Sequence, residues 1–189
     1  MTDPDLTLDW SLTWEDEVSD DEHIALARLF ARAYPHSAAT FTGARSWSGA
    51  RPELRIVGRL DGRPVAHLGV LRRFLHVPAL DRSLLVGDVG LAAVDPDHHR
   101  RGIGTVLLQR AAATLHALDL PFGFMTPGHW VVPFYRSGGW SLIDGQTTRM
   151  IGPDQRVEDF DGPAMVLPVR APLDDWPVGC RVDRNGLEV

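Results

Sequence analysis

The sequence lacks the features that define several large classes of protein. Its one cysteine, Cys180, cannot form a disulfide within the chain, so we expect a cytoplasmic protein. No apolar run approaches the roughly 20 residues that cross a bilayer, so we expect no membrane span. Residues 1–9 are acidic and carry neither a basic start nor an apolar stretch, so we expect no secretory signal.

Signals for metals and for nucleic acids are also missing. No paired-cysteine or His-Glu-x-x-His spacing occurs, and the neighbouring His98 and His99 point apart, so we expect no metal. The net charge of −6 disfavours nucleic acids and anionic membranes as partners. It is compatible with a cationic acceptor such as a polyamine or an aminosugar, although ordinary solubility explains it equally well.

What the sequence does contain is typical of one globular domain over residues 1–189. Hydrophobic residues make up 44% and charged residues 23%, close to the globular average. Apolar periodicity predicts strands interleaved with helices, which indicates a mixed α/β (α+β) fold. Asp61-Gly62-Arg63 predicts a hairpin turn, and Gly87 and Gly90 predict a bulge or a close backbone approach within a strand. The predicted strands are 6–14, 53–60, 64–77, 83–94, 121–125, 140–151 and 164–169. The first predicted helix follows the capping residues Asp20 and Asp21 and ends at Tyr34, and two further helices are predicted over 103–118 and 129–137. Residues 36–52 are predicted to be a loop, with a short helix within it as an alternative.

The loop between strand 83–94 and helix 103–118 carries the strongest functional signal. Its glycines let the backbone turn so that successive N–H groups point into one cavity. The helix N-terminus adds a partial positive charge, and Arg100 and Arg101 add full charges. This chemistry favours binding of a pyrophosphate. The spacing fits neither a Walker loop nor the G-x-G-x-x-G dinucleotide fingerprint.

The same loop resembles the acyl-CoA loop of the GNAT superfamily, [Gln/Arg]-x-x-Gly-x-[Gly/Ala], with His99 in place of the first Gln or Arg. The resemblance implies the GNAT fold, a central mixed, mostly antiparallel sheet of about seven strands flanked by about four helices. It also implies acetyl-CoA or another acyl-CoA as co-substrate, with the thioester oxyanion held by a backbone N–H near residues 92–94. The cofactor-binding residues that it implies are Ala92, Val94, His99, Arg100, Arg101, Gly102, Ile103, Gly104 and Thr105.

A second match lies downstream, in residues 133–140 (PFYRSGGW). It resembles the short helix of the same superfamily that ends in Phe-Tyr-x-x-x-Gly-[Phe/Trp]. The resemblance implies that Tyr135 stands near the CoA sulfur and protonates the leaving thiolate. The alternative is that Tyr135 is an ordinary packed aromatic residue of the core.

The resemblance extends to a branch of the superfamily. Residues 42–53 (TGARSWSGARPE), 66–74 (AHLGVLRRF), 121–124 (PFGF) and 183–186 (DRNG) resemble the NodA nodulation N-acyltransferases, which acylate the terminal amine of a chitin oligosaccharide. Residues 133–140 and 173–176 (LDDW) also resemble the aminoglycoside 2′-N-acetyltransferases. Both families act on the amine of an aminosugar, which is the implied acceptor class.

The cofactor loop departs from the NodA pattern, which is less basic and takes its acyl chain from acyl carrier protein. Arg100 and Arg101 favour the 3′-phosphorylated nucleotide end of free CoA as the group bound here.

Amide formation needs a neutral amine, and therefore a modest base. Asp88 is the first candidate, because a carboxylate that interrupts an apolar strand is costly without a partner or a task, and both relatives carry a glutamate at the matching place. The alternatives are a buried pair with an arginine or an anchor for a cationic acceptor. His67 is the second candidate, although a lone core histidine is more often structural. His129 faces the same choice.

The acceptor pocket is predicted from aromatic and charged residues. Tryptophan faces commonly stack on sugars, and carboxylates attract a cationic amine. The alternative for all of these residues is ordinary packing and surface charge. The candidates for acceptor contact are Arg45, Trp47, Arg51, Glu53, Asp88, His129 and Trp176.

Three functions remain open from the sequence. The leading hypothesis is acetyl transfer from acetyl-CoA to an aminosugar or aminoglycoside by direct attack in a ternary complex, for antibiotic resistance, self-protection or biosynthesis. The first alternative is a NodA-like transfer of a longer acyl chain, from CoA or acyl carrier protein. The second is a non-catalytic acyl-CoA-binding module. A homodimer is implied by analogy only.

Overall fold

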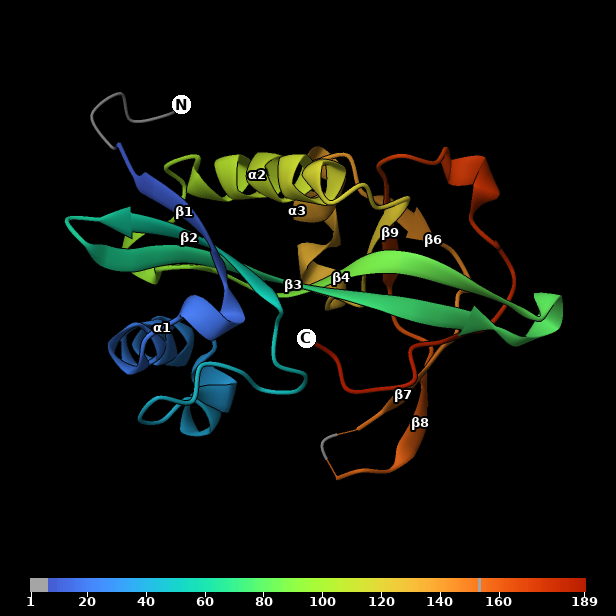
Figure 1. Ribbon diagram of the computed structural model, residues 1–189, viewed down its shortest axis with the longest axis horizontal. Helices are drawn as coiled ribbons and strands as arrows, with labels where there is room; N and C mark the ends of the chain where they lie inside the picture. The colour runs from blue at the N-terminus through green and yellow to red at the C-terminus, as the bar shows by residue number, and fades with distance from the viewer. Residues whose placement is uncertain (1–6, 153) are drawn as a thin grey trace. The chain divides into compact units, whose positions relative to one another are not determined.

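The computed structural model (Figure 1) describes residues 7–152 and 154–189. The chain divides into two compact units. The first unit contains the chain up to Leu71, together with Gly90–Ala111 and Val189, and the second contains Arg72–Val89 and Ala112–Glu188. Strands β3 (Arg63–Val77) and β4 (Arg82–Val94) and helix α2 (Ile103–Ala117) each contribute residues to both units. The single domain expected from the sequence stays a prediction.

The first unit is built on an antiparallel ribbon of β1 (Asp9–Trp14), β2 (Leu54–Leu60) and the first part of β3. The predicted hairpin between β2 and β3 is confirmed. Asp61 (φ 50°) and Gly62 (φ 78°) both adopt left-handed backbone conformations, as a tight two-residue hairpin turn of the I′ type requires.

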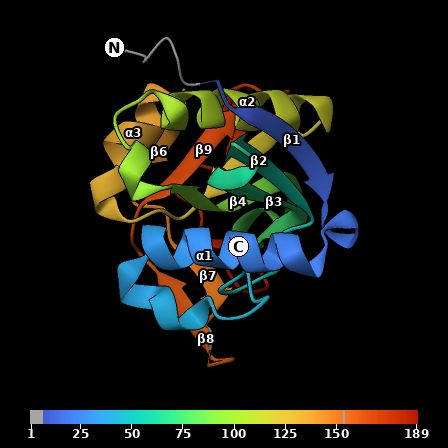
Figure 2. The same cartoon turned by 90° about the vertical axis from the view of Figure 1, so that its left-hand side faces the viewer.

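Helix α1 (Asp20–Ala33) lies beside the strands β1 and β2 (Figures 1 and 2). Its cap is Ser19, whose hydroxyl accepts a hydrogen bond from the backbone N–H of Glu22 at 3.3 Å. The prediction that Asp20 and Asp21 are the capping residues is therefore wrong. They occupy the first turn, where carboxylates interact favourably with the helix dipole. The apolar face of α1 forms a core with residues of β2 and β4, namely Leu26, Ala27, Leu29, Phe30, Phe41, Val57, Leu91 and Ala93.

The predicted close approaches in β4 are confirmed. A Cβ on Gly87 would lie 2.2 Å from the Leu115 side chain, and a Cβ on Gly90 would lie 2.2 Å from the carbonyl oxygen of Val189. Leu91, the next residue, has a left-handed backbone (φ 51°), which is unusual for a bulky residue within a strand. The end of β4 that leads into the predicted cofactor loop is therefore irregular.

The second unit contains a sheet in the order β6-β9-β5-β4-β3-β10-β7-β8. Strand β5 (Phe122–Met125) is parallel to β4 and antiparallel to β9 (Ala164–Pro168). The short helix α3 (Val132–Ser137) follows a 3-10 turn at His129–Val131, as predicted for residues 129–137. The remaining strands are β6 (Ser141–Ile143), β7 (Thr148–Ile151), β8 (Val157–Phe160) and β10 (Val182–Asp183).

The strand count differs from the expected seven. Within the described residues there are ten strands, three α-helices and six 3-10 turns. The predicted strand 140–151 is two strands, because the chain turns between them at Gly145 (φ 66°). Two strands have no recognisable alternation of apolar and polar residues in the sequence. Strand β8 is polar and exposed, and strand β10 is only two residues long. No helix in the described part of the chain is long and apolar enough to cross a membrane.

Candidate active site

The predicted cofactor loop leaves β4 and enters α2 within the first unit. It consists of a 3-10 turn at Pro96–His98 and then an alternation of backbone conformations, with Arg100 (φ 62°) and Gly102 (φ 80°) in the left-handed region. Such an alternation directs successive N–H groups into one concavity, a geometry that binds anions. The arginine at 100 is exposed, and α2 begins directly after Gly102, at Ile103.

Three side chains hold this loop in place. The carboxylate of Asp95 accepts a hydrogen bond from the backbone N–H of Asp97 at 3.0 Å. Arg32 of α1 binds Asp95 at 2.9 Å and Asp97 at 2.6 Å, so the loop is tied to the first helix. His99 donates a hydrogen bond from Nε2 to the carbonyl of Val94 at 3.0 Å. The imidazole of His99 therefore has a structural task in the loop.

The end of β4 is also held by side chains. The hydroxyl of Tyr34 donates to the carbonyl of Ala92 at 2.8 Å, and His67 Nδ1 donates to the carbonyl of Leu91 at 2.9 Å. These two bonds satisfy the carbonyl groups around the left-handed residue Leu91. The sequence predicts a contact between the thioester and the backbone of β4 near Ala92. The hydrogen bond from Tyr34 holds the carbonyl group of that residue in place.

His67 is fully buried, and both of its ring nitrogens have partners. Nδ1 donates to Leu91, and Nε2 accepts a hydrogen bond from Arg55 Nη1 at 3.2 Å. Burial, reinforced by the positive charge of Arg55, lowers the pKa of His67 to about 3. A neutral imidazole with two fixed partners favours the structural alternative for His67, and its role as a base stays a prediction.

The pKa of His67 predicts a pH dependence of stability. The unfolded state takes up a proton near pH 6.5 and the folded state does not until about pH 3, so the free energy of unfolding falls as the pH drops below 6.5. We expect a contribution of about 1.4 kcal/mol per pH unit. Urea unfolding at pH 7.5, 6.5 and 5.5 measures it. The His67→Asn variant is expected to be less stable but to show a shallower slope, and equal slopes would remove His67 as the cause.

A charged network missed by sequence reasoning surrounds His67. Arg55 is fully buried in β2, where it forms two contacts with Glu15 and donates to the carbonyl of Ser46 at 3.2 Å. Burial raises the pKa of Glu15, but the hydrogen bonds and charges of Arg55 and Arg51 outweigh it, so the pKa lies below its usual range. Arg55 interrupts an apolar strand in the same way as Asp88, and that signal was available in the sequence.

Part of the predicted acceptor set is brought together in the first unit. The guanidinium of Arg51 lies 4.6 Å from the ring centroid of Trp47, binds Glu15, and contacts His23 Nε2 at 3.0 Å. Arg45 donates to the carbonyl of Trp47 at 3.3 Å. An open hollow of about 580 Å³ is lined by two of the predicted residues, Arg51 and Glu53, and by Trp14, Glu15, Asp16 and Glu17.

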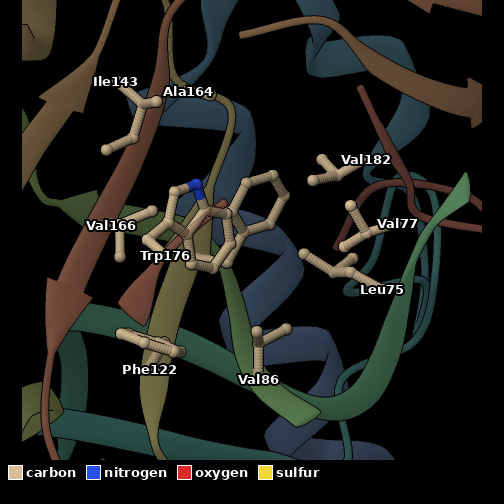
Figure 3. Close-up of a cluster of buried hydrophobic side chains, with 10 residues drawn as sticks. Leu75, Val77, Val86, Phe122, Ile143, Ala164, Val166, Trp176 and Val182 are labelled. Atoms are coloured by element: carbon tan, nitrogen blue, oxygen red, sulfur yellow. The ribbon is translucent and has the colours of Figure 1, made fainter. Parts of the chain in front are cut away.

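Trp176 does not fit the acceptor role predicted for it. The residue is 2% exposed, and Figure 3 shows it among Phe122, Val86 and Val166 in the core of the second unit. Its indole N–H donates to Gln146 Oε1 at 3.1 Å. Because neither face of the ring is accessible, the packing alternative holds for Trp176.

Asp88 lies in the second unit in the arrangement that the sequence left as an alternative, a buried pair with arginine. Its side chain is 1% exposed, and that of Arg184 is fully buried. Arg184 Nη2 donates to Oδ1 at 3.2 Å, and Oδ2 lies 3.0 Å from Arg184 Nε and 3.1 Å from Arg73 Nε. Burial raises the pKa of Asp88, and the two guanidinium groups act in the opposite direction.

The polar cluster continues from Arg184 to a second carboxylate. Arg184 Nη2 also donates to Thr126 Oγ1 at 3.0 Å, and that hydroxyl donates to Glu188 Oε1 at 2.5 Å. Arg184 Nη1 lies 3.8 Å from Glu188 Oε1. The side chain of Glu188 is 49% exposed, in contrast to Asp88. Sequence reasoning missed Arg73, Thr126 and Glu188, because only the fold brings them to Asp88.

Tyr135 is also in the second unit, on α3. It is 8% exposed and packs against Phe134 and Trp140, at ring-centroid distances of 5.2 and 6.2 Å. Burial, with a smaller contribution from the charge of Glu188, raises the pKa of Tyr135 to about 12. The hydroxyl is therefore protonated at neutral pH, which is the state that a proton donor needs.

Comparison with known proteins identifies the family. A family model described as nodulation protein A (NodA) matches residues 5–189. The chain is 37% identical over 193 residues to nodulation protein A of Rhizobium tropici, with 95% of this chain and 97% of that protein covered. It is 39% identical over 197 residues to nodulation protein A of Bradyrhizobium sp. (strain ANU 289), with 95% and 91% covered. The chain belongs to the nodulation protein A (NodA) family.

Solved structures show the fold of this NodA-family chain. The GNAT family N-acetyltransferase YhbS from Escherichia coli, in complex with CoA, superimposes with a TM-score of 0.64 at 16% identity, covering 98% of this chain and 93% of that chain. Tetrahymena GCN5 gives a TM-score of 0.57 at 13% identity, covering 88% and 99%. The predicted GNAT fold is confirmed, and the chain is an N-acyltransferase.

Proposed function

We propose that this NodA-family chain transfers an acyl group longer than acetyl from a thioester donor to the primary amine of an aminosugar oligomer. The observation that carries the proposal is the match to the NodA family over residues 5–189. The segments 42–53 and 183–186, which resemble NodA in sequence, both lie within the residues that the structure describes. The acceptor class that the sequence implied is retained.

This proposal reverses the order of the sequence-based hypotheses. Acetyl transfer to an aminoglycoside was favoured from the basic loop and from residues 133–140. A family match across nearly the whole chain outweighs two short segments and supports the NodA-like alternative better. Because the chain is an N-acyltransferase, the non-catalytic module is no longer needed as an explanation.

The donor side of the proposal rests on the loop at residues 95–104. The left-handed residues Arg100 and Gly102 turn the backbone toward an anion, and the N-terminus of α2 adds its dipole. A pyrophosphate of acyl-CoA suits this arrangement, and the likeness in fold to a CoA complex supports it. The phosphopantetheine arm of acyl carrier protein offers one phosphate to the same loop, so acyl-CoA is the preferred donor.

A glycine substitution tests the donor loop. Valine at a left-handed position costs about 1–3 kcal/mol of backbone strain, so we expect Gly102→Val to weaken CoA binding by about 5- to 150-fold. Gly62→Val is the matched control, because Gly62 has nearly the same φ but lies in the β2–β3 hairpin. Isothermal titration with CoA should show normal affinity for Gly62→Val. Unchanged affinity of Gly102→Val would remove the loop from the donor site.

The choice of donor and acceptor is tested by one kinetic comparison. Purified protein is assayed for thiol release with acetyl-CoA, long-chain acyl-CoA and long-chain acyl carrier protein, each with glucosamine oligomers and with aminoglycosides. We expect the highest kcat/KM for long-chain acyl-CoA with a glucosamine oligomer, and a higher value with long-chain acyl carrier protein would overturn the choice of donor. A preference for acetyl-CoA with an aminoglycoside would restore the hypothesis that the sequence first favoured.

A further inference from the structure

The polar cluster in the second unit contains two carboxylates whose environments differ. Asp88 has both oxygens against guanidinium groups and is 1% exposed. Glu188 accepts one hydrogen bond from Thr126 and is 49% exposed. The exposed half of the Glu188 side chain is accessible to a proton from outside the cluster, whereas Arg184 and Arg73 enclose Asp88. The two carboxylates are therefore suited to different tasks.

The segment that carries Glu188 is held at several points. The backbone N–H of Arg184 donates to the carbonyl of Arg149, and Ile151 donates to the carbonyl of Gly186, so the segment runs beside β7. Asn185 turns the chain with a left-handed backbone (φ 56°). Arg73 Nη1 donates to the carbonyl of Leu187 at 2.9 Å. This tail includes residues 183–186, which resemble the NodA sequence. It places Glu188, four residues beyond Arg184 in the chain, within 3.8 Å of the Arg184 guanidinium.

The charges of the cluster are balanced. Arg73 and Arg184 carry two positive charges, and Asp88 and Glu188 carry two negative ones. Desolvation raises the pKa of Glu188 above its usual range, while Arg184 and the hydrogen bond from Thr126 act in the opposite direction. The raised pKa brings the carboxylate closer to the neutral range in which a general base is most efficient.

Tyr135 belongs to the same unit as Glu188, and burial, with a smaller contribution from the charge of Glu188, raises the pKa of its phenol. Tyr135 is protonated at neutral pH and Glu188 is the accessible carboxylate of the cluster. An acceptor of protons and a donor of protons therefore occur in one unit of the fold. Amide formation from an ammonium and a thioester requires both.

We propose that Glu188, rather than Asp88, is the base that deprotonates the acceptor amine, a role that rests on the acyl transfer proposed above. Glu188 takes one proton from the ammonium and passes it to solvent, which leaves a neutral amine. The amine lone pair then forms the N–C bond to the thioester carbonyl as the C–S bond breaks. Glu188 takes the second proton from the nitrogen, and the Tyr135 hydroxyl gives a proton to the leaving thiolate. Solvent then removes the proton from Glu188 and replaces the one that Tyr135 has lost. Asp88 and the two arginines hold the tail that carries Glu188.

The test compares Glu188→Gln with wild type in the transfer assay, with Glu158→Gln on the exposed strand β8 as the matched control. We expect Glu188→Gln to lower kcat/KM by about 10²–10⁴-fold. In wild type, kcat/KM should fall at low pH as Glu188 becomes protonated, and this fall, the acidic limb of the pH profile, should be absent from the variant. Thermal stabilisation by CoA should be retained, because the donor loop is untouched. Glu158→Gln should behave as wild type.

A second variant tests the role through the pKa of Glu188. The Thr126 hydroxyl donates to Glu188 and so favours the carboxylate form. Thr126→Val should therefore move the acidic limb of kcat/KM to higher pH while Glu188 is still present. Wild-type turnover in Glu188→Gln, or an unmoved limb in Thr126→Val, would overturn the role. Loss of CoA stabilisation in Glu188→Gln would assign Glu188 a structural role instead. If the wild type transferred no acyl group with any donor and amine, the proposed function would be contradicted, and the role of Glu188 with it.

Discussion

Asp88→Ala should lower the free energy of unfolding by about 3–5 kcal/mol, because it leaves the buried guanidinium of Arg184 without its main partner. Arg73 loses the same carboxylate. Urea unfolding at pH 7.5 measures the change. Asp159→Ala, on the exposed strand β8, is the control and should stay within about 0.5 kcal/mol of wild type.

Asp88→Asn separates the role of base from that of a buried partner of arginine. If Asp88 only pairs with Arg184 and Arg73, turnover falls together with stability, because the tail that carries Glu188 is held less firmly. A loss of about 100-fold in kcat with unchanged stability would instead make it the base. Equal stability of Asp88→Ala and wild type would contradict the account of the buried cluster.

Tyr135→Phe should lower kcat by about 100-fold or more, because the variant keeps the packing of α3 but has no proton for the leaving thiolate. The measurement is thiol release under saturating donor and acceptor. Folding stability and CoA affinity are the internal controls, and both should change little.

The leaving group gives a sharper version of this test. A thioester of a more acidic thiol needs no proton donor, so Tyr135→Phe should lose far less activity with such a donor than with acyl-CoA. The same loss with both donors would show that Tyr135 supports the fold and not the departure of the thiolate. The pKa of about 12 keeps the wild-type phenol protonated across the whole neutral range.

The features that sequence predicted best are those encoded in contiguous residues. The backbone turn of the predicted cofactor loop follows from residues 100–104, where charge, glycine and a helix start occur together, and its binding of a cofactor stays a prediction. The β2–β3 turn follows from Asp61 and Gly62, whose left-handed backbones the turn type demands. Each of these depends on local backbone geometry, which a few neighbouring residues determine.

The features that sequence could not give depend on partners distant in the chain. Asp88 was recognised as exceptional, but its partner Arg184 is 96 residues away and nothing local links them. The sequence does not mark Glu188 as a candidate site residue, because acidic residues are common in polar segments near the end of a chain. The sequence predicts Trp176 as an acceptor contact, because its burial depends on Phe122 and Phe124 of β5, which are distant from it in the chain.

The most direct test of the central claim is the mass of the product. A glucosamine oligomer with one free amine is incubated with the protein and a long-chain acyl-CoA. The account predicts a product heavier by one acyl group, with the group in amide linkage on that amine. Release of thiol with no change in the mass of the oligomer, or no consumption of the donor, would contradict it.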